Sequence, residues 1–144
     1  MENIGIIGAG VMGLTVAEKI VATGHRLAVY DVSANAVRRA GKIGAQVAQS
    51  PSEVGRISDI ILLFLPGPAE VTECVTSADG LLDTLKPGKA IVDMTSAVRL
   101  RSVIGPCQSA ANRKPLSAVN RFLTFLPPIS SMQVPPARAT RLNC

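Results

Sequence analysis

The stretch that decides the fold is Asn3-Ile4-Gly5-Ile6-Ile7-Gly8-Ala9-Gly10-Val11-Met12-Gly13, an apolar run that leads directly into the pattern G-x-G-x-x-G. Residues 3–7 have the unbroken apolar character of a strand that is buried on both faces. Apolar residues then recur at helical spacing, at Val11, Leu14, Ala17, Ile20 and Val21. A glycine turn between a buried strand and a helix is the context in which this pattern predicts a dinucleotide-binding site.

Each glycine of the turn has its own predicted role. Gly8 allows the tight turn out of the strand, Gly10 leaves room for the pyrophosphate, and Gly13 lets the helix pack closely on the strand. The unpaired amides around Val11 and Met12 would face the phosphate with the positive end of the helix dipole. Because glycine is common in turns, the alternative is a turn with a purely structural role.

Asp31 ends the second predicted strand, residues 26–30, roughly 20 residues after the glycine turn. A carboxylate at this place can accept hydrogen bonds from the ribose hydroxyls of the adenosine, and it would repel a 2′-phosphate. The next residues, Val32 and Ser33, offer no arginine. The sequence therefore predicts NAD as the cofactor, and the structural alternative makes Asp31 a cap of the next helix.

NADP is the alternative cofactor. Arg38 and Arg39 lie on the next predicted helix, from which a side chain could reach inward to a 2′-phosphate.

Strand and helix signals alternate up to residue 96. Strands are predicted over 3–7, 26–30, 45–48, 60–65 and 90–94. Helices are predicted over 11–21, 33–39, 68–75 and 81–85. A further helix is predicted to begin at residue 51, with a capping box of Ser50 and Glu53. This order predicts an α/β fold, an incomplete Rossmann-type doubly wound parallel sheet. The ligand of such a sheet lies at the carboxyl ends of its strands, which here are followed by Gly8 to Met12, Asp31, Leu65, Pro66, Thr95 and Ser96.

The charge of the chain is divided unevenly. Residues 1–96 carry a net charge of −2 and residues 97–144 carry +7 without any acidic residue, which together give the formal charge of +5. Six of the 10 prolines also fall after residue 96. We therefore expect a dinucleotide-binding domain over 1–96, with a last helix that extends to about residue 105. An irregular, basic, Pro- and Arg-rich tail over 97–144 is expected to follow it.

Length and composition exclude several classes of protein. The longest apolar run, residues 60–65, is too short to cross a membrane. Neither a signal peptide nor a presequence is recognised. The 3 cysteines are scattered without C-x-x-C spacing, which predicts neither a metal site nor a disulfide framework. The cytoplasm is the expected compartment.

The chain resembles the β-hydroxyacid dehydrogenases related to 3-hydroxyisobutyrate dehydrogenase. The matching segments follow one another in order at 8–13, 24–25, 50–54, 59–61, 65–66, 80–82, 85–88 and 92–96. The glycine pattern alone would also fit 3-hydroxyacyl-CoA dehydrogenases, and the last two segments favour the β-hydroxyacid family. The resemblance implies a nicotinamide cofactor, with Leu65, Pro66, Thr95 and Ser96 near its ribose and nicotinamide ends.

Members of this family exchange hydride between the nicotinamide and a small 3-hydroxy acid or its aldehyde acid. A D-A-P-V-S-G-G-like substrate loop and a helical domain with a catalytic lysine follow their fifth strand, and neither is recognised in this chain. Lys114, the only lysine after Lys89, is followed by proline and is read as a solvated charge. His25 is read as a turn residue at the edge opposite the cofactor, so no catalytic residue is assigned.

Two functions are therefore expected. The first is the NAD(P)-binding half of a 3-hydroxyisobutyrate dehydrogenase-like oxidoreductase, truncated and inactive alone, which acts on a 3-hydroxy acid only if a catalytic domain is supplied. The alternative is a non-enzymatic module that binds a dinucleotide or pairs with itself or a full-length relative. No metal or membrane partner is expected.

The tail admits three interpretations. It is read as the product of a shifted frame, aberrant splicing or a wrongly assigned end, as a basic segment for anionic membranes or nucleic acid, or as part of a compact single-domain reductase. Nucleic acid is disfavoured because the arginines are dispersed and no aromatic stacking platform accompanies them.

Overall fold

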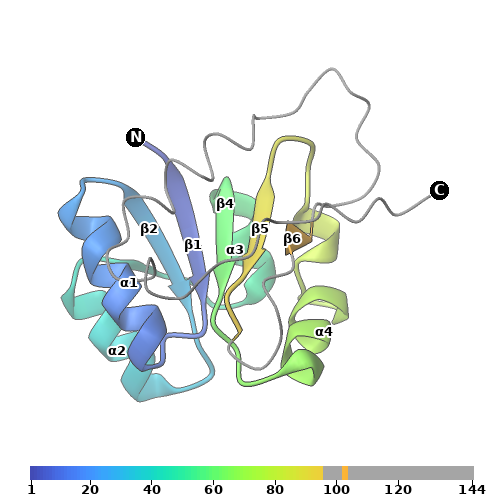
Figure 1. Cartoon of the computed structure of the whole chain (residues 1–144), viewed down its shortest axis with the longest axis horizontal. Helices are drawn as coiled ribbons and strands as arrows, with labels where there is room; N and C mark the ends of the chain where they lie inside the picture. The colour runs from blue at the N-terminus through green and yellow to red at the C-terminus, as the bar shows by residue number, and fades with distance from the viewer. Residues whose placement is uncertain (96–101, 104–144) are drawn as a thin grey trace, which may run out of the picture.

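Five parallel strands and one antiparallel strand form the sheet of the computed structural model, which describes residues 1–95 and 102–103 (Figure 1). The strands are β1 (Asn3–Ile7), β2 (Arg26–Tyr30), β3 (Gln46–Val47), β4 (Ile60–Leu63), β5 (Ala90–Asp93) and β6 (Ser102–Val103). The helices are α1 (Val11–Ala22), α2 (Ala34–Lys42), α3 (Pro51–Ile57), α4 (Pro68–Thr76) and the 3₁₀ turn η1 (Leu82–Thr84). The spatial order β3-β2-β1-β4-β5-β6 confirms the predicted Rossmann-type α/β fold.

Three local predictions are wrong. Helix α2 does not end before Gly41 but continues through it to Lys42, and the chain turns at Gly44, which has a φ of +91°. The helix predicted over 81–85 is a single 3₁₀ turn. The helix predicted to about residue 105 meets a strand instead, since Ser102–Val103 pairs antiparallel with β5. Ser96 and the tail residues other than Ser102 and Val103 lie outside the described residues.

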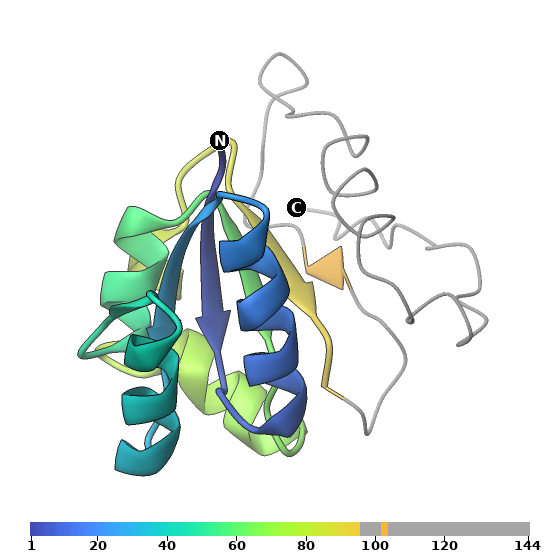
Figure 2. The same cartoon turned by 90° about the vertical axis from the view of Figure 1, so that its left-hand side faces the viewer.

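Two apolar layers cover the sheet. On one face Ile4, Ile6, Val29 and Leu62 pack against α1 and α2, and on the other face Ile7 and other alternate residues pack under α3 and α4. Figure 2 shows α1 and α3 on opposite sides of β1. Because both faces are covered, β1 and β4 consist almost entirely of buried apolar residues, as the sequence predicts.

Helix α3 is fixed to the sheet at its middle and capped at its start. A Cβ at Gly5 in β1 would collide with a methyl of Val54 and lie 2.7 Å from Oγ of Ser58, so only glycine lets α3 approach this closely. At the helix start, the Ser50 hydroxyl accepts from the Glu53 amide at 3.2 Å. The Glu53 carboxylate accepts from the Gln49 amide at 2.7 Å, one residue before the partner of a standard capping box.

Lys89 closes the other end of α3. Its ammonium donates to the backbone carbonyl oxygens of Gly55 at 2.5 Å, Arg56 at 3.0 Å and Ser58 at 2.7 Å. The last carbonyls of a helix have no partner within it and carry the negative end of its dipole. Burial lowers the pKa of Lys89 from its ordinary value, and Asp59 opposes that shift.

None of the helices in the described part of the chain is long and apolar enough to cross a membrane.

Candidate functional site

The glycine turn lies between the carboxyl ends of β2 and β4, at the lower end of the sheet in Figure 1. Gly8 has a φ of +95°, and its N–H donates to the carbonyl oxygen of Tyr30 at 3.0 Å. A Cβ at Gly8 would collide with the carbonyl oxygen of Phe64. Both the backbone conformation and the space therefore require glycine at this position.

Gly13 and Gly10 differ in what surrounds them. A Cβ at Gly13 would overlap the carbonyl oxygen of Gly8, so this buried glycine lets α1 approach the turn. A Cβ at Gly10 would meet nothing within 4 Å. The fold itself therefore does not need a glycine at residue 10, and the open space beside it is where a ligand could come close to the backbone.

The start of α1 is open to an anion. Its N-cap is Gly10, which has no side chain to bind the first amides, and its first turn contains no acidic residue. Val11 and Met12 are 77% and 60% exposed. Because the first N–H groups of a helix lack partners within it, they and the dipole attract negative charge at this end. In helix α3, by contrast, the Ser50 side chain accepts a hydrogen bond from one first-turn amide, that of Glu53.

Asp31 joins the end of β2 to the glycine turn. Its Oδ2 accepts from the Ala9 N–H at 2.5 Å and its Oδ1 from the Ser33 N–H at 2.7 Å. The second bond agrees in part with the alternative role of Asp31 as a helix cap. It reaches the N–H of Ser33, which is the N-cap residue of α2 and makes no capping bond with its own side chain. The bond to Ala9 was not predicted from the sequence. The parallel register of β1 and β2 could have indicated this bond, because it pairs Ile7 with Tyr30 and so places residue 31 beside the turn.

The other predicted site residues that the structure describes follow strands that end at the same edge, and they are Leu65, Pro66 and Thr95. Leu63 pairs with both Ile7 and Asp93, so the residues that follow β1, β4 and β5 lie in neighbouring positions. After β4, Leu65 is half-buried and Pro66 is exposed.

Thr95 follows β5 and is 6% exposed. Its N–H donates to Oδ1 of Asp93 at 2.9 Å, and its buried Oγ1 has no hydrogen-bond partner among the described residues. Ser96, the last of the predicted site residues, lies outside them.

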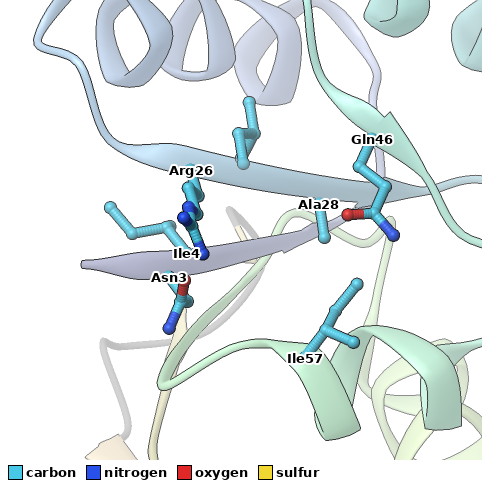
Figure 3. A pocket seen from close by; sticks show the side chains of 7 residues that line it. Asn3, Ile4, Arg26, Ala28, Gln46 and Ile57 are labelled. Atoms are coloured by element: carbon cyan, nitrogen blue, oxygen red, sulfur yellow. The ribbon is translucent and has the colours of Figure 1, made fainter. Parts of the chain in front are cut away.

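A different set of residues lies at the amino end of the sheet. His25 is in the turn before β2, and its Nδ1 accepts from the Glu2 N–H at 3.2 Å. A pocket of about 140 Å³ is lined by Asn3, Ile4, Arg26, Leu27, Ala28, Gln46 and Ile57 (Figure 3). The lining includes the first residues of β1, β2 and β3 and the last residue of α3. This pocket is thus separate from the glycine turn.

Residues 3–112 match the family model described as the NAD binding domain of 6-phosphogluconate dehydrogenase. A probable 3-hydroxyisobutyrate dehydrogenase of Dictyostelium discoideum, described as mitochondrial, is 34% identical over 95 residues, which are 66% of this chain and 30% of the relative. The mitochondrial 3-hydroxyisobutyrate dehydrogenase of Mus musculus is 33% identical over 93 residues, 65% of this chain and 28% of the relative. The matched part thus spans about 30% of the length of these relatives.

Solved structures show the same fold. A Mycobacterium tuberculosis 3-hydroxyisobutyrate dehydrogenase with L-serine has a TM-score of 0.62 and 26% identity, over 66% of this chain and 32% of that one. An imine reductase of Myxococcus stipitatus in complex with NAD⁺ has a TM-score of 0.62 at 23% identity, over 67% of this chain and 32% of that one, and at this identity shows the fold alone. The chain therefore belongs to the family of the NAD-binding domain of 6-phosphogluconate dehydrogenase, and the matched part is similar to the NAD-binding domain of 3-hydroxyisobutyrate dehydrogenase-like oxidoreductases.

Proposed function

We propose that this domain binds NAD in preference to NADP and forms the cofactor-binding half of an oxidoreductase that acts on small 3-hydroxy acids or their aldehyde acids. The observation that carries the proposal is the open space at Gly10 beside the uncapped start of α1, with the Asp31 carboxylate at the adjoining strand end. This edge combines an anion site with an acceptor for ribose hydroxyls.

Each part of the edge has a role in holding the cofactor. The N–H groups of Gly10, Val11 and Met12 would receive the pyrophosphate, and Asp31 the adenosine ribose. The resemblance assigns Leu65, Pro66, Thr95 and Ser96 to the ribose and nicotinamide side. The orphaned Oγ1 of Thr95 supports this assignment, since a buried hydroxyl without a partner is stabilised by a ligand that hydrogen-bonds to it. The bound nicotinamide would supply the hydride chemistry.

The preference for NAD rests on the residues around Asp31. Val32 is 92% exposed and Ser33 is exposed, so neither offers a positive charge to a 2′-phosphate. The carboxylate itself repels such a group.

The described residues contain no group to which we assign proton transfer. Turnover would therefore require a substrate-binding and catalytic domain, and the greater length of the relatives supports this requirement. A full-length relative is the partner that would supply it.

Titration of the purified protein with NADH and NADPH, followed by calorimetry or nicotinamide fluorescence, tests the cofactor preference. We expect tighter binding of NADH. Val32→Arg should raise the affinity for NADPH about tenfold, the size of one charge-assisted hydrogen bond. Leu82→Arg is the matched control, because Leu82 is a half-exposed apolar residue on η1 and gains the same charge away from Asp31. Tighter NADPH binding by the wild type, or equal effects of the two arginines, would contradict the proposal.

An activity assay separates the half-enzyme from the alternatives. We expect NADH binding without oxidation of 3-hydroxy acids by the purified 144-residue protein. Robust turnover would contradict the proposed inactivity. Co-purification with a full-length relative, combined with binding of the dinucleotide, would favour the partner-binding module.

The compartment is a separate question. The compartment expected from the sequence is the cytoplasm, whereas the Dictyostelium and mouse relatives are described as mitochondrial. Fractionation of cells that express the tagged chain would decide between the two.

A further inference from the structure

The glycine turn is attached to the end of β2 by two consecutive backbone groups. The Gly8 N–H donates to the Tyr30 carbonyl oxygen at 3.0 Å, and the Ala9 N–H donates to the Asp31 carboxylate at 2.5 Å. A backbone bond at the first position is ordinary sheet geometry. The second bond is different, because it depends on one side chain and is assisted by its charge.

The carboxylate that makes this bond is itself fixed. Its other oxygen accepts from the Ser33 N–H at 2.7 Å, so both oxygens are engaged and the side chain has one orientation. On the side away from β2, Gly8 lies against the carbonyl of Phe64, the residue that follows β4. The Ala9 peptide is thus held in place, and it is followed at once by Gly10, Val11 and Met12, whose amides would meet the pyrophosphate.

We infer that Asp31 is a positioning residue for the pyrophosphate-binding amides, in addition to its proposed role as acceptor for the ribose hydroxyls. The inference rests on the proposed function and goes beyond it, since one carboxylate would couple ribose recognition to the geometry of the phosphate site. Binding of the pyrophosphate would then depend on Asp31 even when the ligand offers no ribose hydroxyl at that place.

The direction in which the affinity changes separates the positioning role of Asp31 from its role as acceptor for the ribose hydroxyls. A carboxylate close to a pyrophosphate repels it, so loss of the charge alone should tighten the binding of a ligand without the ribose hydroxyls. Loss of a positioning bond should weaken the binding of the same ligand. Asp31→Asn removes the charge and leaves one acceptor oxygen, which can serve only one of the two N–H groups of Ala9 and Ser33.

The experiment measures the affinities of wild type and Asp31→Asn for NADH and for the NADH analogue whose adenosine ribose lacks both hydroxyls. The matched control is Asp59→Asn. Asp59 also accepts a hydrogen bond, from the Asn3 side chain at 2.9 Å, but at the amino end of β4. We expect Asp31→Asn to weaken binding of the analogue about tenfold, and Asp59→Asn to leave it unchanged.

Equal or tighter binding of the analogue by Asp31→Asn would overturn the positioning role, and so would a wild type that binds NADH but not the analogue. A wild type that binds no NADH would instead contradict the proposed function. If Asp31→Asn does not fold, hydrogen exchange of the wild type decides the matter. Protection of the Ala9 amide like that of Gly8 supports positioning, and exchange as fast as that of Gly10 overturns it.

Discussion

Gly10→Ala should separate cofactor binding from folding. Its methyl group would meet no atom within 4 Å, and the backbone at φ −66° and ψ −166° is accessible to alanine. Alanine gains about 0.4–1 kcal/mol through the reduced entropy of the unfolded chain. It loses about 0.5 kcal/mol as a poorer N-cap than glycine. The two effects nearly cancel, so the free energy of unfolding should change by less than about 0.5 kcal/mol.

Binding should respond quite differently. The methyl would occupy the space through which a pyrophosphate approaches the amides of Val11 and Met12. Loss of one charge-assisted hydrogen bond corresponds to a loss of about tenfold to a hundredfold in affinity for NADH.

Two further glycine variants serve as comparisons for the stability and the NADH affinity of Gly10→Ala. Gly13→Ala places its methyl on the carbonyl oxygen of Gly8, a backbone atom that cannot rotate away. It should lower the free energy of unfolding by about 1–2 kcal/mol, because the overlap outweighs the gain in helix propensity. Gly41→Ala lies within α2, where its methyl makes only a 3.8 Å contact with Val47. It should stabilise the fold by about 0.5–1 kcal/mol and leave binding unchanged.

Urea denaturation gives the free energies of unfolding and titration with NADH gives the affinities. Binding of NADH by Gly10→Ala with the affinity of the wild type would contradict the proposed place of the pyrophosphate beside residue 10. A loss of stability as large as that of Gly13→Ala would contradict the separation of binding from folding, because the loss of binding would then follow from damage to the fold.

Other predictions concern the ends of α3 and the buried thiol. Ser50→Ala should cost about 1 kcal/mol of unfolding free energy by urea denaturation, whereas Ser33→Ala, at an N-cap without a side-chain bond, should change it little. Lys89→Met should lower the free energy of unfolding by about 1 kcal/mol, because the bonds to the α3 carbonyls are lost. Lys86→Met is its control, since it removes the same charge from an exposed residue. Burial, with a smaller effect of Glu73, raises the pKa of Cys74 to about 11, so peptide-resolved mass spectrometry should find this thiol alkylated by iodoacetamide far more slowly in folded than in unfolded protein. The raised pKa also means that this thiol's contribution to stability is complete below about pH 9 and lost as the pH rises toward 11, a loss that Cys74→Ala should remove from the alkaline denaturation profile.

The regular part of the fold could be predicted because its signals are local. The apolar runs at β1 and β4, the helical spacing after Gly10 and the Ser50 cap each lie within a few residues, and all appear in the structure. The extent of α2 was missed, because Gly41 interrupts helices in isolation but is tolerated here against β3.

The contacts that shape the candidate site could not be predicted in the same way. The bond between Asp31 and Ala9 joins residues that only the sheet register brings together. The bonds of Lys89 to the end of α3 and the close approach of Val54 to Gly5 also join distant parts of the sequence. Residue type gives no local signal for such contacts, so sequence patterns place the edge of the sheet correctly and leave its internal bonds unknown.

The central position of β1 has a consequence for how the chain folds during synthesis. Ile4 pairs with Leu27 on one side and with Ile60 on the other. Strand β1 therefore precedes both of its neighbours in the chain, and the sheet cannot be completed around it until β4 has left the ribosome. Its apolar side chains need transient cover until then, from helix α1 or from a chaperone. A deletion of only the first seven residues would remove the middle of the sheet, not an edge.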